Sequence, residues 1–208
     1  MKERHLVYQL PLFYCPPSMQ FSTIEQYIDA CQTHYESYFA TSGKKVLWRE
    51  GPIEKLHPYF YVLEFRPSAS NNYWAYCTVG MSLGRPEESA IELFVLSPYQ
   101  TDSIAELLLL CASFHRTSAP LDLGHTVNIG RSWLPDSVCD HAFISLPYLH
   151  GEKLELLIVS EHTTHCYWLI PISRAEREYK ISQGAEALEQ LFEEKNLDYL
   201  NPMRRSLV

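Results

Sequence analysis

The sequence predicts an α+β fold, in which a mixed or mostly antiparallel sheet is packed by helices. Three observations lead to this prediction. Short aromatic and β-branched runs follow one another in groups, segments with apolar residues at 3- and 4-residue steps stand apart from them, and Gly or Pro marks most boundaries. The expected order is a helix, three strands, a helix, about four strands and two helices. This segregation of strands from helices is typical of α+β proteins.

The first helix is expected at about residues 22–42. Its start carries a capping-box pattern, Ser22 followed by Glu25, and Gly43 closes it. Apolar residues recur on one helical face, which predicts packing against a core. They are Ile24, Tyr27, Ile28, Cys31, Tyr35, Tyr38 and Phe39.

Three strands are expected next, at about residues 59–65, 74–79 and 91–96, because each is rich in aromatic or β-branched residues and is bounded by Pro or Gly. Their spacing suits antiparallel hairpins or a meander. A second helix is expected at about residues 102–114, with Ser103 and Glu106 as a capping box. Its apolar stripe is so wide that little of it is expected to face water, which places it across the inner face of the sheet.

The second half of the chain starts with a looser stretch, residues 118–140, that contains one short strand near 125–129. Further strands are expected at about 142–146, 154–159 and 166–170.

Two helices are expected to end the chain. Ser173 and Glu176 form a capping box at the start of the first, whose charged face is expected to carry a Glu176–Lys180 pair one turn apart. Gly184 breaks this helix, and the last one follows at about residues 185–195.

Composition excludes several classes of protein. The chain has 208 residues, of which 46% are hydrophobic and 20% charged, so it is not a disordered protein and one domain, 1–208, is expected. The formal net charge is −8 without a large Lys/Arg cluster, which argues against nucleic-acid binding. No apolar run approaches the roughly 20 residues of a membrane span, and no signal peptide is recognised. We expect a soluble, cytoplasmic protein without a cofactor, whose six cysteines are buried and reduced.

A catalytic site is not evident, and we expect no enzyme. The Glu87-Glu88 and Glu193-Glu194 pairs are typical of solvated surfaces, and phosphate-binding glycine loops and nucleophile elbows are absent. The alternative is a metal-dependent or hydrolytic enzyme that uses His125, His162 and His165. Strand alternation, however, places His162 and His165 on opposite faces.

Two loops are the candidates for binding a partner, because binding residues concentrate in loops held by rigid elements. One covers residues 85–88 and the other covers 122–136, where Trp133 is expected to be exposed. Ordinary variable loops are the alternative reading of both. The candidate partner-binding residues are Arg85, Glu87, Glu88, Asp122, Trp133 and Asp136.

Several motifs in order resemble one known family. The run from Trp74 to Ser82, an aromatic strand that ends in Gly80-Met81-Ser82, is followed by a strand with a Glu92-Leu93 pair. Gly124-His125-Thr126-Val127, the segment 171–176, Gly184 and Met203-Arg204-Arg205 come later in the expected order. This set, over about residues 48–207, resembles the Suppressor of fused (SUFU) superfamily, and residues 1–45 lie outside it. Structural roles are expected for Gly80, Met81, Gly124, His125, Arg204 and Arg205.

The resemblance implies an α+β, SUFU-like binding module without catalysis. The animal relative has two domains and holds a transcription-factor peptide partly by strand addition, and this chain resembles only the first domain. Short relatives with one module are bacterial, and many are regarded as immunity proteins of secreted toxins. The family therefore implies that this chain binds and neutralises a cognate toxin domain. An acidic chain suits a basic toxin, because complementary charge speeds association. An intracellular peptide-binding scaffold is the other alternative.

Overall fold

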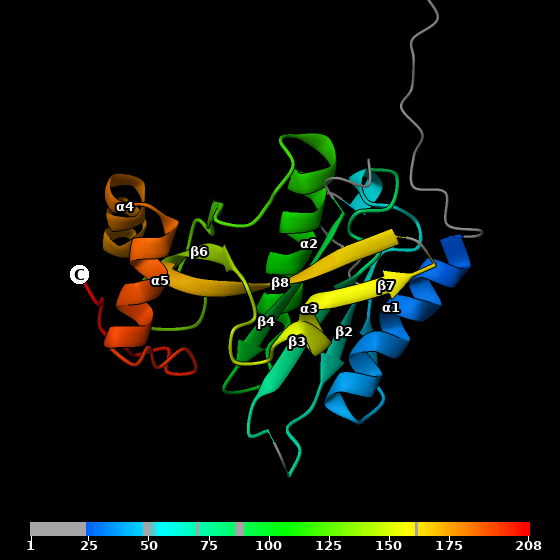
Figure 1. Cartoon of the computed structure of the whole chain (residues 1–208), viewed down its shortest axis with the longest axis horizontal. Helices are drawn as coiled ribbons and strands as arrows, with labels where there is room; N and C mark the ends of the chain where they lie inside the picture. The colour runs from blue at the N-terminus through cyan, green and yellow to red at the C-terminus, as the bar shows by residue number, and fades with distance from the viewer. Residues whose placement is uncertain (1–23, 48–50, 52, 70, 86–89, 161) are drawn as a thin grey trace, which may run out of the picture.

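One sheet contains all the strands in the part of the chain that the computed structural model describes, which is residues 24–47, 51, 53–69, 71–85, 90–160 and 162–208. Its order is β1-β2-β3-β4-β8-β6-β5, and β7 pairs with β8 outside this path (Figure 1). The β4–β8 pair is parallel and the other pairs are antiparallel, which confirms the predicted fold class. The strands are β1 (Lys44–Val46), β2 (Tyr61–Phe65), β3 (Trp74–Val79), β4 (Ile91–Ser97), β5 (Thr126–Asn128), β6 (Cys139–Ser145), β7 (Leu156–Val159) and β8 (His162–Ser173).

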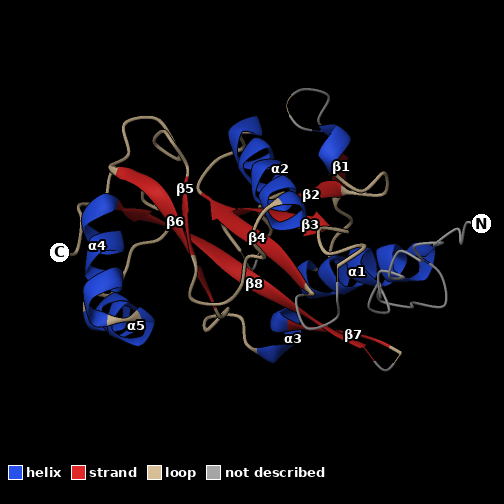
Figure 2. Cartoon of the chain, turned by 90° about the horizontal axis from the view of Figure 1, so that it is seen from above, coloured by secondary structure: helices blue, strands red, loops and turns tan. Residues whose placement is uncertain are grey.

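Helices cover both faces of this sheet. The α1 helix and the α4–α5 pair lie at opposite ends of the molecule, with α2 between them (Figures 1 and 2). The side chains of α1 and α5 share one apolar cluster with the sheet, and those of α2 share a second cluster. The helices are α1 (Ile24–Phe39), α2 (Asp102–Thr117), α3 (Glu152–Glu155), α4 (Arg174–Gln183) and α5 (Ala185–Glu194), with a short 3-10 turn at Ile53–Lys55.

The central strands are apolar on both sides because each face has its own core. In β4, Leu93 and Val95 join the α2 cluster, whereas Phe94 and Leu96 join the α1 cluster. The sheet therefore has two inner faces, and α2 covers one of them, as predicted. Strands that are buried on both sides read as continuous apolar runs, as β4 does.

A buried carboxylate ties α1 to β3 and β4. The Oε1 atom of Glu92 accepts hydrogen bonds from the Tyr27 hydroxyl at 2.7 Å and from the Gly80 and Met81 backbone N–H groups at 3.0 Å. Its Oε2 atom accepts one from the Thr78 hydroxyl at 2.6 Å. Gly80 has φ +85°, and a Cβ atom there would approach Ile28 Cδ1 to 3.0 Å. The backbone N–H groups of Gly80 and Met81 thus hold the Glu92 carboxylate in place.

The second helix differs from its prediction at its start and on its outer face. The side chain of Thr101, and not that of Ser103, caps α2 by accepting the Ser103 N–H at 3.3 Å, so the capping box with Glu106 was wrong. Leu110 and Phe114 are 45% and 47% exposed. They lie one turn apart, so one side of α2 faces solvent although its composition predicted otherwise.

Other helix and strand boundaries also differ from the predicted ones. The strand predicted from residue 154 begins at Leu156, because α3 occupies the preceding residues, and the strand predicted from 166 begins at His162. Tyr59 is exposed and precedes β2, and β1 was not predicted. Helix α1 ends at Phe39, where Ala40 takes φ +51°, and its predicted cap at residues 22–23 lies outside the described residues.

The C-terminal segment is held by a buried ion pair. The capping box of α4 forms as predicted, since Ser173 and Glu176 exchange hydrogen bonds between side chains and backbone. Glu176 is nevertheless buried and forms an ion pair with Arg204, in which Nη1 of Arg204 lies 2.6 Å from Oε1 of Glu176. The predicted surface pair of Glu176 with Lys180 was therefore wrong. Burial raises the pKa of Glu176, but the Arg204 guanidinium and the Ser173 and Leu207 backbone N–H groups together outweigh it, so the net pKa lies below the ordinary value. Arg205, next along the chain, is exposed.

We expect Arg204→Met to lower the free energy of unfolding by about 3–5 kcal/mol at pH 7, because Glu176 would stay buried without its cation. The matched control is Arg205→Met, which should change stability by less than about 0.5 kcal/mol. Urea unfolding at pH 7 and pH 4 measures both variants. The pair stabilises the protein above the unfolded carboxyl pKa of about 4.5 and loses this effect as the pH falls, so the deficit of Arg204→Met should shrink at pH 4. Equal deficits in the two variants would contradict this role.

Candidate protein-binding site

The edge strand β5 is the first feature of the candidate site. Its register pairs Val127 with Ala142 of β6. The Ile144 N–H donates to His125 O at 2.9 Å and the Ile129 N–H donates to Asp140 O at 3.0 Å, so the His125 carbonyl and the backbone groups of residues 127 and 129 face β6. Thr126 and Asn128 therefore direct their N–H and C=O groups away from β6. No strand of the described chain pairs with this edge.

Glycines bound this edge strand on both sides. Gly124 has φ +77° and Gly130 has φ +78°, a backbone region that other residues rarely adopt. Gly124 also donates its N–H to Ile144 O at 2.8 Å. The His125 ring is exposed, but its Nδ1 atom accepts the Asp122 N–H at 3.2 Å and so fastens the turn before β5. His125 therefore makes a structural contact with the turn, although its ring lies at the surface.

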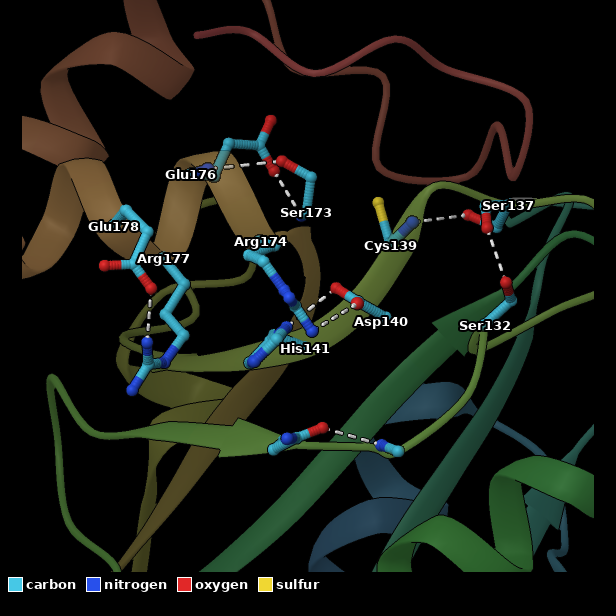
Figure 3. Close-up of polar contacts among 12 residues, drawn as sticks. Ser132, Ser137, Cys139, Asp140, His141, Ser173, Arg174, Glu176, Arg177 and Glu178 are labelled. Atoms are coloured by element: carbon cyan, nitrogen blue, oxygen red, sulfur yellow. Dashed lines mark hydrogen bonds and ion pairs between the residues drawn. The ribbon is translucent and has the colours of Figure 1, made fainter.

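The loop from Ser132 to Ser137 is fixed by its own side chains (Figure 3). The Trp133 indole N–H donates to Ser137 Oγ at 3.0 Å, and the Cys139 N–H donates to the same oxygen at 3.2 Å. The Ser132 hydroxyl donates to Ser137 O at 2.6 Å. Trp133 is only 4% exposed, so the prediction that it faces solvent was wrong. It packs into the α2 core and holds the loop in place.

A cavity of about 250 Å³ lies between α2 and residues 129–133. Leu110 and Trp133 line it, and an ion pair between Arg131 and Glu106 lies at its rim. With the exposed Leu110 in its lining, this cavity offers apolar surface beside Ile129 and Gly130, which follow β5. The arrangement suits a peptide that adds to an edge strand and inserts a side chain nearby.

Charges of both signs surround the start of β6. Asp140 Oδ1 lies 2.7 Å from His141 Nδ1, and Asp140 Oδ2 lies 4.0 Å from the exposed Arg174 of α4 (Figure 3). Arg177 pairs with its neighbour Glu178 at 2.5 Å. The candidate residues Asp122 and Asp136 are exposed, and Asp136 has φ +62°. This surface is therefore mixed in charge, although the chain as a whole is acidic.

Of the other predicted loop, 85–88, the structure describes Arg85 alone. Arg85 is half-buried, and its Nη2 atom donates to Ser118 O, at the C-terminal end of α2, at 3.5 Å. Glu87 and Glu88 lie outside the described residues. Their role in binding stays a prediction.

The histidines of the alternative enzyme reading are not gathered into one site. His125 precedes β5, whereas His162 and His165 belong to β8, where His165 Nδ1 lies 3.3 Å from Glu155 Oε1. In the described ranges, no group of three or more His, Cys, Asp or Glu side chains could hold a metal ion. Five cysteines in these ranges are free and buried, and burial raises the pKa of each thiol.

The family is decided by comparison with known proteins. The family model described as Suppressor of fused protein (SUFU) matches residues 57–205. A solved structure of a protein from Neisseria gonorrhoeae FA 1090, named as a SUFU homologue, superposes with a TM-score of 0.78 at 31% sequence identity, over 88% of this chain and 98% of that chain. The chain belongs to the Suppressor of fused family. The resemblance identified in the sequence is thereby confirmed.

Two further SUFU-fold structures match at 13% identity, which shows the shared fold alone. One is the Sufu–Fu complex, with a TM-score of 0.65 over 87% of this chain and 92% of that chain. The other is Drosophila Suppressor of Fused, with a TM-score of 0.54 over 71% of this chain and 42% of that one. This SUFU chain therefore spans less than half of the Drosophila structure. No curated protein matches it.

Among the described residues, no helix is both long enough and apolar enough to cross a membrane.

The sequence did not single out four residues of the candidate site, Thr126, Asn128, Asp140 and Arg174. Only the pairing of β5 with a single neighbour identifies the first two, and a single sequence carries no signal for that. The capping box at Ser173 located the start of α4, but not its approach to β6.

We expect Ser137→Ala to lower the free energy of unfolding by about 1–3 kcal/mol, since it leaves the Trp133 indole and the Cys139 N–H as buried donors without this acceptor. Cleavage of the loop in limited proteolysis should also speed up. Val138→Ala changes an exposed neighbour and is the matched control. If both variants unfolded at the same denaturant concentration, the role of Ser137 in fixing the loop would be refuted.

Proposed function

We propose that this SUFU-family chain is a non-catalytic protein-binding module that takes a strand of its partner onto the open edge of β5. The observation that carries the proposal is the outward direction of the Thr126 and Asn128 backbone groups on a strand whose flanks are fixed. Main-chain hydrogen bonds of an added strand supply affinity, and pockets beside it supply specificity. The cavity between α2 and the loop at Trp133 is such a pocket.

The comparisons support a protein as the ligand. One structure of the same fold is named as a complex between Sufu and Fu, so a protein of this fold is bound there to another protein. The buried thiols with raised pKa values favour binding over nucleophilic catalysis, because the thiolate is the reactive form.

The finer proposal is an immunity function. The partner is then a toxin domain, and the SUFU chain neutralises it by covering its active site. The support is the family together with the formal charge of −8, which suits a basic toxin such as a nuclease. An intracellular scaffold would use the same edge but would bind a non-toxic partner.

The first experiment is affinity purification of the chain from its native cells, followed by mass spectrometry and reconstitution with the purified partner. The immunity proposal predicts a partner near one to one whose toxicity in cells is relieved by co-expression of this chain. A tight reconstituted complex that leaves the partner fully active would refute occlusion of its active site.

Thr126→Pro tests strand addition directly. Proline removes the outward N–H of Thr126 and costs no bond to β6, so edge strands tolerate it at such positions. We expect the affinity for the partner to fall at least about tenfold, in line with the loss of a hydrogen bond and of close approach at the edge. Thr126→Ala keeps the N–H and should bind within about twofold of the wild type.

Isothermal titration calorimetry measures both variants, and thermal unfolding checks that both are folded. Equal affinities of Thr126→Pro and Thr126→Ala would show that no strand is added at β5.

A further inference from the structure

A second cavity lies on the other side of β6, where α5 packs. We call it the α5 groove. It has a volume of about 640 Å³, against about 250 Å³ for the cavity beside Trp133, and it lies between α5, the segment after β6 and the turn that follows α5. Its aromatic lining comes from Tyr148, Trp168, Phe192 and Tyr199. The Trp168 and Tyr199 rings meet edge to face at 4.9 Å.

The groove carries a fixed carboxylate. Glu189 Oε1 accepts the Ser145 hydroxyl at 2.6 Å, and its Oε2 accepts the Tyr148 hydroxyl at 2.9 Å. These two bonds hold the carboxylate in one orientation, and each oxygen keeps a free lone pair. Glu193 is one turn further along α5 and lines the same groove.

The negative charge of the groove is not compensated. None of its lining residues is Lys or Arg, and neither Glu189 nor Glu193 belongs to an ion pair among the described residues. Burial, together with the hydrogen bond to Glu189 and the charge of Glu189, raises the pKa of Tyr148 to about 12. The surface at the start of β6 is mixed in charge, whereas the charged side chains that line the α5 groove are both glutamates.

A rigid turn holds two of the large side chains that line the groove in contact with solvent. Tyr148 and Leu149 are 60% and 65% exposed, yet the turn that carries them is closed by bonds from the His150 and Gly151 N–H groups to Pro147 O at 2.7 and 2.8 Å. The His150 ring packs edge to face on Trp168 at 5.7 Å, and its Nδ1 atom lies 2.8 Å from the Tyr38 hydroxyl. Burial lowers the pKa of His150 to about 4, so the ring is neutral at pH 7. Large apolar side chains that a fixed turn holds in solvent are typical of a binding surface.

We propose that the α5 groove binds a basic side chain, Arg or Lys, next to an apolar residue in a segment of the protein partner. A guanidinium or ammonium group placed between Glu189 and Glu193 is attracted by both carboxylates. The methylene groups of the basic side chain, and the apolar residue next to it, then cover the aromatic side chains of the groove. The groove thus gives a second contact site, separate from the β5 edge. This inference rests on the proposed function, in that the ligand belongs to a protein.

The test uses a probe that does not depend on the natural partner. The acetylated tripeptide amide Leu-Arg-Phe is titrated into the full chain, and the NMR resonances of the Tyr148 and Leu149 amides and the Trp168 indole N–H are followed. We expect saturable shifts at these three groups. The neutral peptide Leu-Gln-Phe should bind at least about threefold more weakly, the effect of one partly exposed charge pair. Equal binding of the two peptides, or no shift in the groove, would overturn the proposal.

Two isosteric variants on α5 provide the matched pair. Glu193→Gln removes a groove charge and should weaken the Leu-Arg-Phe peptide by about threefold. Glu194→Gln makes the same change in net charge on the next residue, which does not line the groove, and should bind within about 1.5-fold of the wild type. Equal weakening by both would assign the effect to the overall field of the protein and refute a local site.

Two further arms separate the possible sources and the two proposals. Free agmatine, a small guanidine without a peptide, should bind much more weakly than Leu-Arg-Phe; binding of equal strength would assign the groove to small amines and overturn the peptide proposal. Thr126→Pro should leave Leu-Arg-Phe binding unchanged. A failure of strand addition at β5 would therefore leave the peptide titrations of the groove valid. Absence of peptide binding in the groove would likewise leave the test of strand addition at β5 valid.

Discussion

The rest of the structure depends on the hydrogen bonding of β8. This strand pairs in parallel with β4 on one side and in antiparallel manner with β6 and β7 on the other. Because β5 reaches the sheet only through β6, the candidate site is attached to the remaining strands through β8 alone. The last residue of β8, Ser173, is also the cap of α4. One strand thus positions the edge at β5, the base of α4 and the aromatic floor of the α5 groove.

Two buried carboxylates fix this framework at different points. Glu92 joins α1 to the turn after β3, and Glu176 joins the start of α4 to the C-terminal segment. Their surroundings differ, because Glu92 is met by hydroxyl and backbone donors, whereas Glu176 is met by a guanidinium in addition to backbone donors. The pKa of Glu92 is accordingly raised by burial, while that of Glu176 is lowered by its partner. In both cases a polar group that would be costly alone specifies one arrangement of neighbouring elements.

Local patterns in the sequence predicted most elements but few of their contacts. The strand at Trp74–Val79 and the cap at Ser173 were predicted, because propensity and capping are properties of neighbouring residues. The burial of Trp133 was not, since a tryptophan in a loop with proline and glycine reads as exposed until its acceptor Ser137 and the α2 core are known. The segment 122–136 was singled out as a loop, but the outward groups of Thr126 and Asn128 follow from a register that only the folded sheet defines. The α5 groove combines residues from β6, β8 and α5 and has no continuous sequence signal.

The parallel pairing of β4 with β8 also bears on the order in which the chain folds. Ile91 pairs with His165, which lies about seventy residues further along, whereas β2, β3 and β4 form hairpins between close neighbours. Closing so long a loop is slow and costs entropy before the contact is made, so the hairpins should form first and the β4–β8 pair late. Until then β4, whose seven residues are all buried in the native protein, is an apolar edge strand open to other chains. The period before β8 docks is therefore the stage at which this chain is most exposed to aggregation.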